Sequence, residues 1–145
     1  MNEVIKIKNL FKQFANLDVD VLETDSAYLI NTSPHELKFD DGSILLGNVE
    51  LAKILKAAPK EKVIKTVNTV TIVKTEFVPE EQGIELVQKI RELNKELSKP
   101  VLLISSIISV QAYGYPVVSP ITTPETSRLP PAQRVVFKNK FNSVL

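Results

Sequence analysis

An amphipathic helix followed at once by a fully apolar strand is the feature that most constrains the fold of this chain. Residues 79–98 open with a proline and two acidic residues, which suit the first turn of a helix. The apolar stripe at helical spacing consists of Leu86, Val87, Ile90, Leu93 and Leu97. Residues 101–104 are continuously apolar, as in a strand buried on both faces. A short helix at 105–113 and a strand at 115–118 complete a helix–strand–helix–strand C-terminal half.

The N-terminal half is rich in strand signals. Residues 18–23 alternate polar and apolar side chains, and residues 27–30 are apolar and β-prone. Residues 36–46 predict a hairpin that turns at Asp40-Asp41-Gly42, and residues 63–77 predict two strands that turn near Asn68. The opening segment and residues 49–58 permit either helix or strand. The fold class is therefore α/β or α+β, with a β-rich N-terminal half and a single mixed sheet.

One domain accounts for the whole chain, because 145 residues suit a single core. Residues 1–26 are expected as an N-terminal extension and residues 138–145 as a tail. Between them, residues 119–131 carry four prolines, which predict a long loop without regular strand pairing.

Composition excludes several classes of protein. The chain lacks cysteine and has one histidine, so disulfide frameworks and thiolate zinc sites are excluded, and neither a metal nor a cofactor is expected. Eighteen basic residues against seventeen acidic ones argue against nucleic-acid binding. No apolar run reaches the roughly 18 residues of a membrane helix, and the N-terminus lacks a signal peptide. We expect a protein of the host cytoplasm or a virion. The Lys/Glu-rich composition also suits a thermophile.

Candidate ligand-binding groups gather in the C-terminal third. From residue 101 onward the chain has four basic residues and one acidic residue, Glu125. The hydroxyl and guanidinium groups of this segment are well suited to binding phosphate. The loop that bears most of them follows a predicted central strand, where open α/β sheets usually bind ligands. The candidate residues are His35, Ser105, Ser106, Thr122, Thr123, Ser127, Arg128 and Arg134.

Each candidate also has a purely structural interpretation. The loop hydroxyls could satisfy the backbone of the loop, and Ser105 or Ser106 could cap the following helix. His35 lies in a proline-containing turn, where a lone histidine is usually structural. If the loop does bind an anion, Arg128 should contribute more than Lys138 or Lys140, because the neighbouring prolines restrict it whereas the lysines lie near the C-terminus.

Two segments of the chain resemble a known group of proteins. Residues 30–37 (INTSPHEL) are similar to the N-L-T-P-H segment of small uncharacterised proteins of bacterial viruses, prophages and some thermophile-associated viruses. Residues 103–107 and 115–120 are similar to a later strand and a proline-containing segment of that group. Thr32 stands where the group usually has an aliphatic residue, and Ser33 replaces a threonine. The resemblance implies a small α/β or β-rich protein of viral or mobile-element origin, with no established activity.

Three functions remain open at this point. The first is a homo-oligomeric module that binds a small anionic, nucleotide-like ligand and sequesters a host defence signal. The second is a structural, virion or protein-interaction protein that assembles through its proline-rich C-terminal arm. The third is a hydrolase that uses His35, although no nucleophile–base pair stands out, so an enzyme is not our main expectation.

Overall fold

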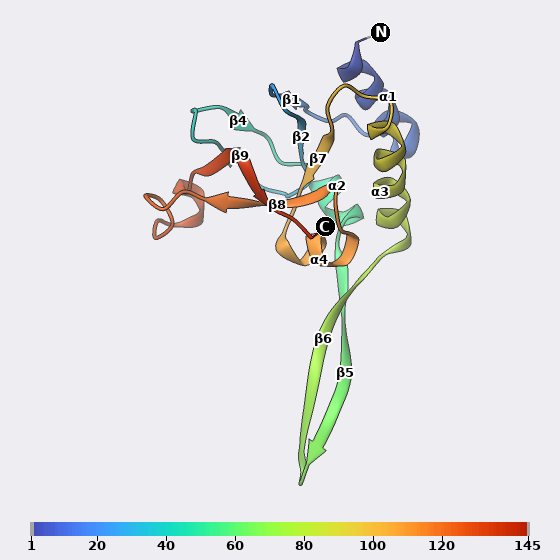
Figure 1. Cartoon of the computed structure of the whole chain (residues 1–145), viewed down its shortest axis with the longest axis vertical. Coiled ribbons are helices and arrows are strands. Elements are labelled where there is room, and N and C mark those ends of the chain that lie inside the picture. The colour runs from blue at the N-terminus through green and yellow to red at the C-terminus, as the bar shows by residue number, and fades with distance from the viewer. Residues whose placement is uncertain (1, 145) are drawn as a thin grey trace.

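A five-stranded mixed sheet forms the centre of the computed structural model, which describes residues 2–144 (Figure 1). The strands, in spatial order, are β1 (Leu22–Glu23), β2 (Tyr28–Asn31), β7 (Val101–Ile104), β8 (Val117–Thr122) and β9 (Val136–Asn142). β2, β7 and β8 are parallel, whereas the edge strands β1 and β9 run antiparallel to their neighbours. The architecture is α+β, and the predicted helix–strand–helix–strand order of the C-terminal half is confirmed.

Helices cover one face of this sheet. They are α1 (Glu3–Ala15), α2 (Val49–Ile54), α3 (Glu81–Asn94) and α4 (Ile107–Tyr113). Val101 and Leu103 of β7 point into this layer, where Leu86 and Ile90 of α3 are fully buried. Because side chains alternate along a strand, Ile104 points to the opposite face.

The opposite face carries a smaller core. The short hairpin of β3 (Leu37–Lys38) and β4 (Ile44–Leu45) packs there, and its turn contains Gly42 at a φ of 86°. The buried side chains of this second core are Ala27, Leu29, Phe39, Leu45, Ile104, Val118 and Val136. The apolar run of β7 is therefore buried on both sides, as its composition predicts.

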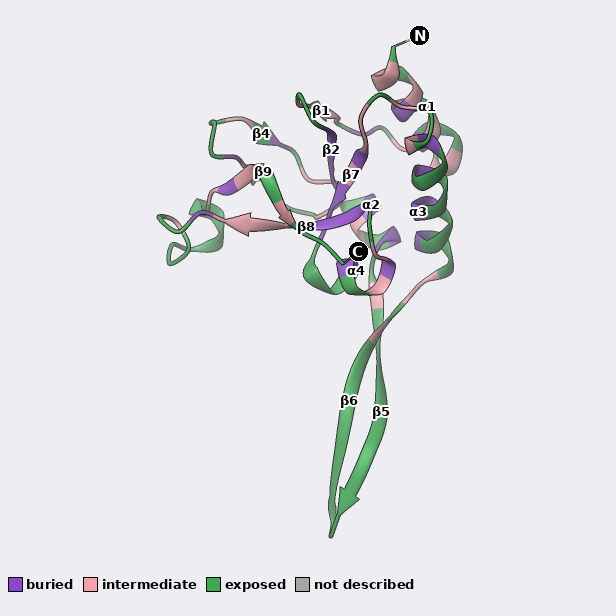
Figure 2. Ribbon diagram, viewed as in Figure 1, coloured by how far each residue is buried: buried purple, intermediate pink, exposed green. Residues whose placement is uncertain are grey.

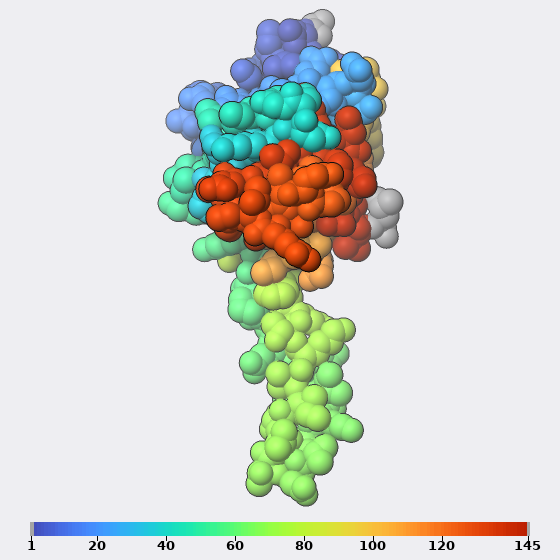
Figure 3. All heavy atoms as spheres, turned by 90° about the vertical axis from the view of Figure 1, so that its left-hand side faces the viewer, coloured from blue at the N-terminus to red at the C-terminus, as the bar shows by residue number. Residues whose placement is uncertain are grey.

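The strands β5 (Ala57–Val67) and β6 (Val70–Pro79) form a long hairpin that projects from the body (Figures 1 and 3). Asn68 occupies the turn with a positive φ of 55°, which confirms the turn expected there. The pair does not join the central sheet, so the expectation of a single sheet holds only for the five central strands. Figure 2 shows that the hairpin is exposed along nearly its whole length.

The N-terminal segment is part of the core and not an extension. Ile7 and Phe11 of α1 have no exposed surface and pack in the helical layer. Mixed periodicity hid this helix in the sequence, because apolar residues also occur off the buried stripe, as at Ile5. Met1, the first residue of the expected extension, lies outside the described residues.

The C-terminal strands are longer than the sequence suggests. β8 continues through Pro120 to Thr122, and β9 continues to Asn142, so most of the expected tail is strand; Leu145 lies outside the described residues. Past Val118 the described pairing of β8 is with β9 alone, and proline is tolerated on such an edge. Within residues 2–144, no helix has the length and apolarity required to span a bilayer.

Glu3 fastens the start of α1 to the body. Its carboxylate accepts hydrogen bonds from the Tyr28 hydroxyl at 2.7 Å and from the hydroxyl and backbone N–H of Ser98, at 2.7 and 3.0 Å. Because these donors favour the charged form, the Ser98 hydroxyl most of all, the pKa of Glu3 falls to about 2. The same contact raises the pKa of Tyr28 to about 12.

Replacing Glu3 should reveal this contact as a pH-dependent loss of stability. Since the folded pKa lies below its ordinary value of 4.5, the carboxylate stabilises the fold above pH 4.5 and loses that effect as the pH falls towards 2. We expect Glu3→Gln to unfold at a lower urea concentration than the wild type at pH 7. The difference should shrink steadily between pH 4.5 and 2. An equal difference at pH 7 and pH 2.5 would contradict this assignment.

Candidate functional site

Ser105 and Ser106 line a small pocket at the carboxyl ends of β2 and β7. Its volume is about 250 Å³. The polar lining residues are Thr32, Ser33, Lys56, Ser105, Ser106 and Ser109. This is the edge of a parallel sheet at which ligands usually bind, and Lys56 brings a positive charge to it.

Several of these hydroxyls already hold the backbone together. The Thr32 hydroxyl donates to the carbonyl of Ile104 at 2.8 Å, and the Ser109 hydroxyl donates to the carbonyl of Leu55 at 2.7 Å. The Ser106 hydroxyl accepts the backbone N–H of Ser109 at 3.2 Å and so caps α4. The capping interpretation of Ser106 is confirmed. Lys56 is the cationic residue that lines the pocket.

The C-terminal loop uses its hydroxyls internally. The hydroxyls of Thr123 and Thr126 are 2.7 Å apart, and the Ser127 hydroxyl donates to the carbonyl of Pro124 at 3.1 Å. Arg134 Nε donates to the carbonyl of Leu129 at 3.0 Å. Three of the loop residues that the sequence suggests for phosphate binding, Thr123, Ser127 and Arg134, are therefore already hydrogen-bonded within the loop. Arg128 remains exposed, and Thr122 is half-buried at the end of β8.

The loop and the serine pocket are separate. Neither Arg128 nor Arg134 lines the pocket. In Figure 1 the loop that follows β8 lies at the left-hand side of the molecule, whereas α4 lies near its centre. The sequence predicts that the loop and the serines meet at one edge of the sheet. This prediction is wrong, because β8 continues four residues beyond its last pairing with β7, to Thr122, before the loop begins. Lys138 is not at a free terminus either, since its Nζ lies 2.5 Å from Asp41 Oδ2.

His35 is exposed in the turn that follows β2. Its backbone carbonyl accepts hydrogen bonds from Asn31 Nδ2 at 2.7 Å and from the Ser33 hydroxyl at 3.0 Å. Two side chains therefore fix the backbone of this turn. Within residues 2–144, no cluster of three or more metal-ligating side chains occurs.

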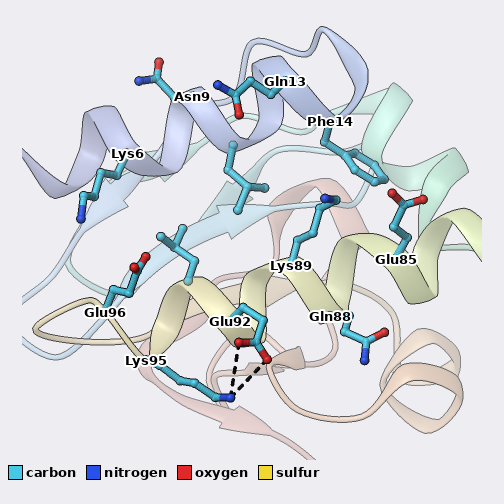
Figure 4. A pocket seen from close by; sticks show the side chains of 12 residues that line it. Lys6, Asn9, Gln13, Phe14, Glu85, Gln88, Lys89, Glu92, Lys95 and Glu96 are labelled. Carbon is cyan, nitrogen blue, oxygen red and sulfur yellow. Dashed lines mark hydrogen bonds and ion pairs between the residues drawn. The ribbon is translucent and has the colours of Figure 1, made fainter.

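A wide groove runs between α1 and α3 and measures about 970 Å³ (Figure 4). Its charged lining residues are Lys6, Glu85, Lys89, Glu92, Lys95 and Glu96, three of each sign. Lys95 and Glu92 pair with each other at 3.2 Å. Balanced charge in an open groove selects no ligand class, so its size alone does not identify it as a site.

The β5–β6 hairpin has two chemically different faces. Residues that pair across an antiparallel ribbon share a face, so the register assigns each side chain. The lysine face holds Lys60, Lys62, Lys65 and Lys74, together with Glu76, Ala58, Val67, Val70, Ile72 and Val78. The apolar face holds Pro59, Val63, Val73 and Phe77, together with Ala57, Pro79, Glu61 and three threonines.

Tyr113 of α4 anchors the base of this hairpin. Its hydroxyl donates to the carbonyl of Lys56 at 2.7 Å and accepts the backbone N–H of Glu80 at 2.9 Å, so one side chain joins both ends of the hairpin. Burial raises the pKa of this hydroxyl. Gly83 is required beside it, because a Cβ there would collide with the Tyr113 hydroxyl and the carbonyl of Ile54.

Comparison with known proteins adds no assignment: no family model, curated protein or solved structure matches the chain.

Removing the Tyr113 hydroxyl should loosen the hairpin at its base. Tyr113→Phe leaves the Lys56 carbonyl and the Glu80 N–H without their partner, which should lower the free energy of unfolding by about 1–3 kcal/mol. Amide hydrogen exchange should quicken most in the residues next to the base. Tyr115→Phe is the matched control, because Tyr115 is more exposed. Equal effects of the two variants would contradict the anchoring role.

Proposed function

We propose that this chain is an assembly protein that self-associates through the β5–β6 hairpin. The observation that carries the proposal is the exposure of branched apolar side chains on a projecting ribbon. They are Val63, Ile64, Val67, Val70, Ile72, Val73 and Val78, each 38–61 % exposed. A two-stranded hairpin alone is at best marginally stable in water. Covering these side chains with a second copy would remove a large apolar surface from water.

The hairpin suits this role better than the proline-rich C-terminal arm does. The loop after β8 satisfies its own polar groups and presents few large apolar side chains, of which Leu129 is 39 % exposed. Neither buried core includes a residue of the hairpin. The packing of the body therefore does not depend on the hairpin. A projecting element of this kind is well placed to bind a partner.

Shortening the hairpin should abolish self-association and leave the body folded. In the test variant, residues 59–77 are replaced by Asn-Gly, so that Ala58 and Val78, which already pair, flank a two-residue turn. We expect cooperative melting and a concentration-independent monomer in sedimentation velocity, whereas the wild type becomes larger as its concentration rises.

Point variants provide the matched comparison. Val70→Ser should weaken association, whereas Leu46→Ser should not, although the two side chains are similarly exposed at 59 % and 58 %. A wild type that remains monomeric, or a shortened chain that still associates, would overturn the proposal. Binding of duplex DNA by a strictly monomeric wild type would reassign the hairpin to nucleic acid through its lysine face and would also overturn it.

The small anionic ligand remains a second candidate, now centred on the pocket beside Lys56. This pocket lies at the carboxyl ends of parallel strands and carries a cation as well as Ser105 and Ser106. Viral origin and the sequestering of a host signal remain predictions from sequence.

A thermal-shift series with inorganic phosphate and nucleotides tests the second candidate. We expect a ligand to raise the melting temperature of the wild type and Arg128→Ala, and to lose most of its effect on Lys56→Ala. The opposite result, with Arg128 required and Lys56 dispensable, would return the site to the C-terminal loop. Absence of a shift in all three proteins would reject the anion-binding candidate.

A further inference from the structure

The two outer edges of the β5–β6 hairpin differ in how well they are protected. β5 carries Pro59, three lysines and a register irregularity between Val63 and Lys65, all of which discourage a further strand from pairing. β6 runs without such an irregularity and is dominated by β-branched residues from Val70 to Val78. In the described part of the chain, neither outer edge is paired. β6 therefore presents the regular edge that favours strand addition.

The charges on the lysine face are unbalanced within one copy. Lys62 lies directly opposite Lys74, and like charges in this arrangement repel. No ion pair joins Lys60, Lys62, Lys65 or Lys74 to another residue within 2–144. An acidic group placed on the free side of Lys74 would relieve this repulsion.

We infer that two copies of the chain pair through β6 in an antiparallel register, with Thr75 on the two-fold axis, an inference that rests on the proposed self-association. In this register, Lys74 faces the partner's Glu76, and Glu76 faces the partner's Lys74. Apolar side chains also meet apolar side chains, because Val73 faces the partner's Phe77 and Ile72 faces the partner's Val78. The sequence of β6 is thus complementary to itself, as a two-fold interface requires.

Neighbouring registers lack this complementarity. An axis at Lys74 would place the two Lys74 side chains opposite each other, and an axis at Glu76 would do the same for the two glutamates. An axis at Val73 places both charged side chains opposite apolar ones. An axis at Phe77 places Glu76 opposite Val78 and Lys74 opposite Glu80, which lies beyond the end of β6. Of the two-fold positions from Val73 to Phe77, Thr75 alone joins lysine to glutamate within β6.

The same register brings the tip of each hairpin close to α4 of the partner. Antiparallel pairing places the tip of each hairpin beside the base of the other, because Val70 then faces the partner's Glu80. Near that base α4 exposes Ile107 and Ile108, which are 49 % and 38 % exposed. The tip residues Val67 and Val70 would supply matching apolar surface. The product is a four-stranded sheet in the order β5–β6–β6–β5 with the less suitable β5 edges outside.

Charge reversal on β6 tests the register directly. In the full-length chain, Lys74→Glu alone or Glu76→Lys alone places like charges opposite each other twice per dimer. Each single variant should raise the dissociation constant of the dimer about tenfold or more. An equimolar mixture of the two variants restores both lysine–glutamate pairs in the heterodimer. Sedimentation velocity of the mixture should therefore show association that neither variant shows alone.

Lys62→Glu is the matched control, because it makes the same charge change on the same face but lies on β5. It should leave the dimer intact, and circular dichroism should show all variants folded. Failure of the mixture to associate, or equal weakening by Lys62→Glu, would overturn the register. Association that survives both β6 variants but requires the hairpin would overturn the register and leave the proposed function standing. A wild type that remains monomeric would remove both.

Discussion

Burial of β7 on both faces is the constraint on which the rest of the structure depends. Val101 and Leu103 pack under the helices, while Ile104 packs under the β3–β4 hairpin. Both of its edges are also paired, with β2 on one side and β8 on the other. A strand without a solvent-facing side requires two covering layers, so the positions of the four helices and of the small second core follow from it.

The polar groups at the ends of this sheet mainly serve the backbone. Parallel strands and short helices leave carbonyl and N–H groups unpaired at the sheet edge, and burying them unsatisfied is costly. Thr32, Ser106 and Ser109 meet this need through their hydroxyls. A serine-rich sheet edge is therefore weak evidence for a ligand unless a charged group with no structural duty accompanies it. The ammonium group of Lys56 forms no ion pair within residues 2–144, so it is such a group here.

The β5–β6 hairpin reverses the usual relation between burial and apolar character. Its strands contain many of the branched residues of the chain, yet none of these side chains is fully buried, and neither core includes them. Tyr113 and Gly83 fix how the ribbon leaves the body, so its direction is set by packing rather than by a flexible linker. An apolar ribbon that is anchored at its base and exposed to solvent is consistent with assembly as its role.

Sequence alone determined the local elements with strong periodicity or composition. The stripe of α3, the apolar run of β7, a serine cap before α4 and the turn at Asn68 are local properties, set by side-chain spacing and backbone preference over a few residues. That the cap is Ser106 and not Ser105 is seen only in the structure. Only the tertiary structure decided which elements meet. Whether Arg128 reaches Ser105, whether α1 belongs to the core and whether residues 57–79 join the central sheet all depend on long-range packing. A β-branched strand has the same pattern whether another strand of its own fold or a second molecule covers it, so the sequence predicts two strands over residues 63–77 but not that they stand apart from the central sheet.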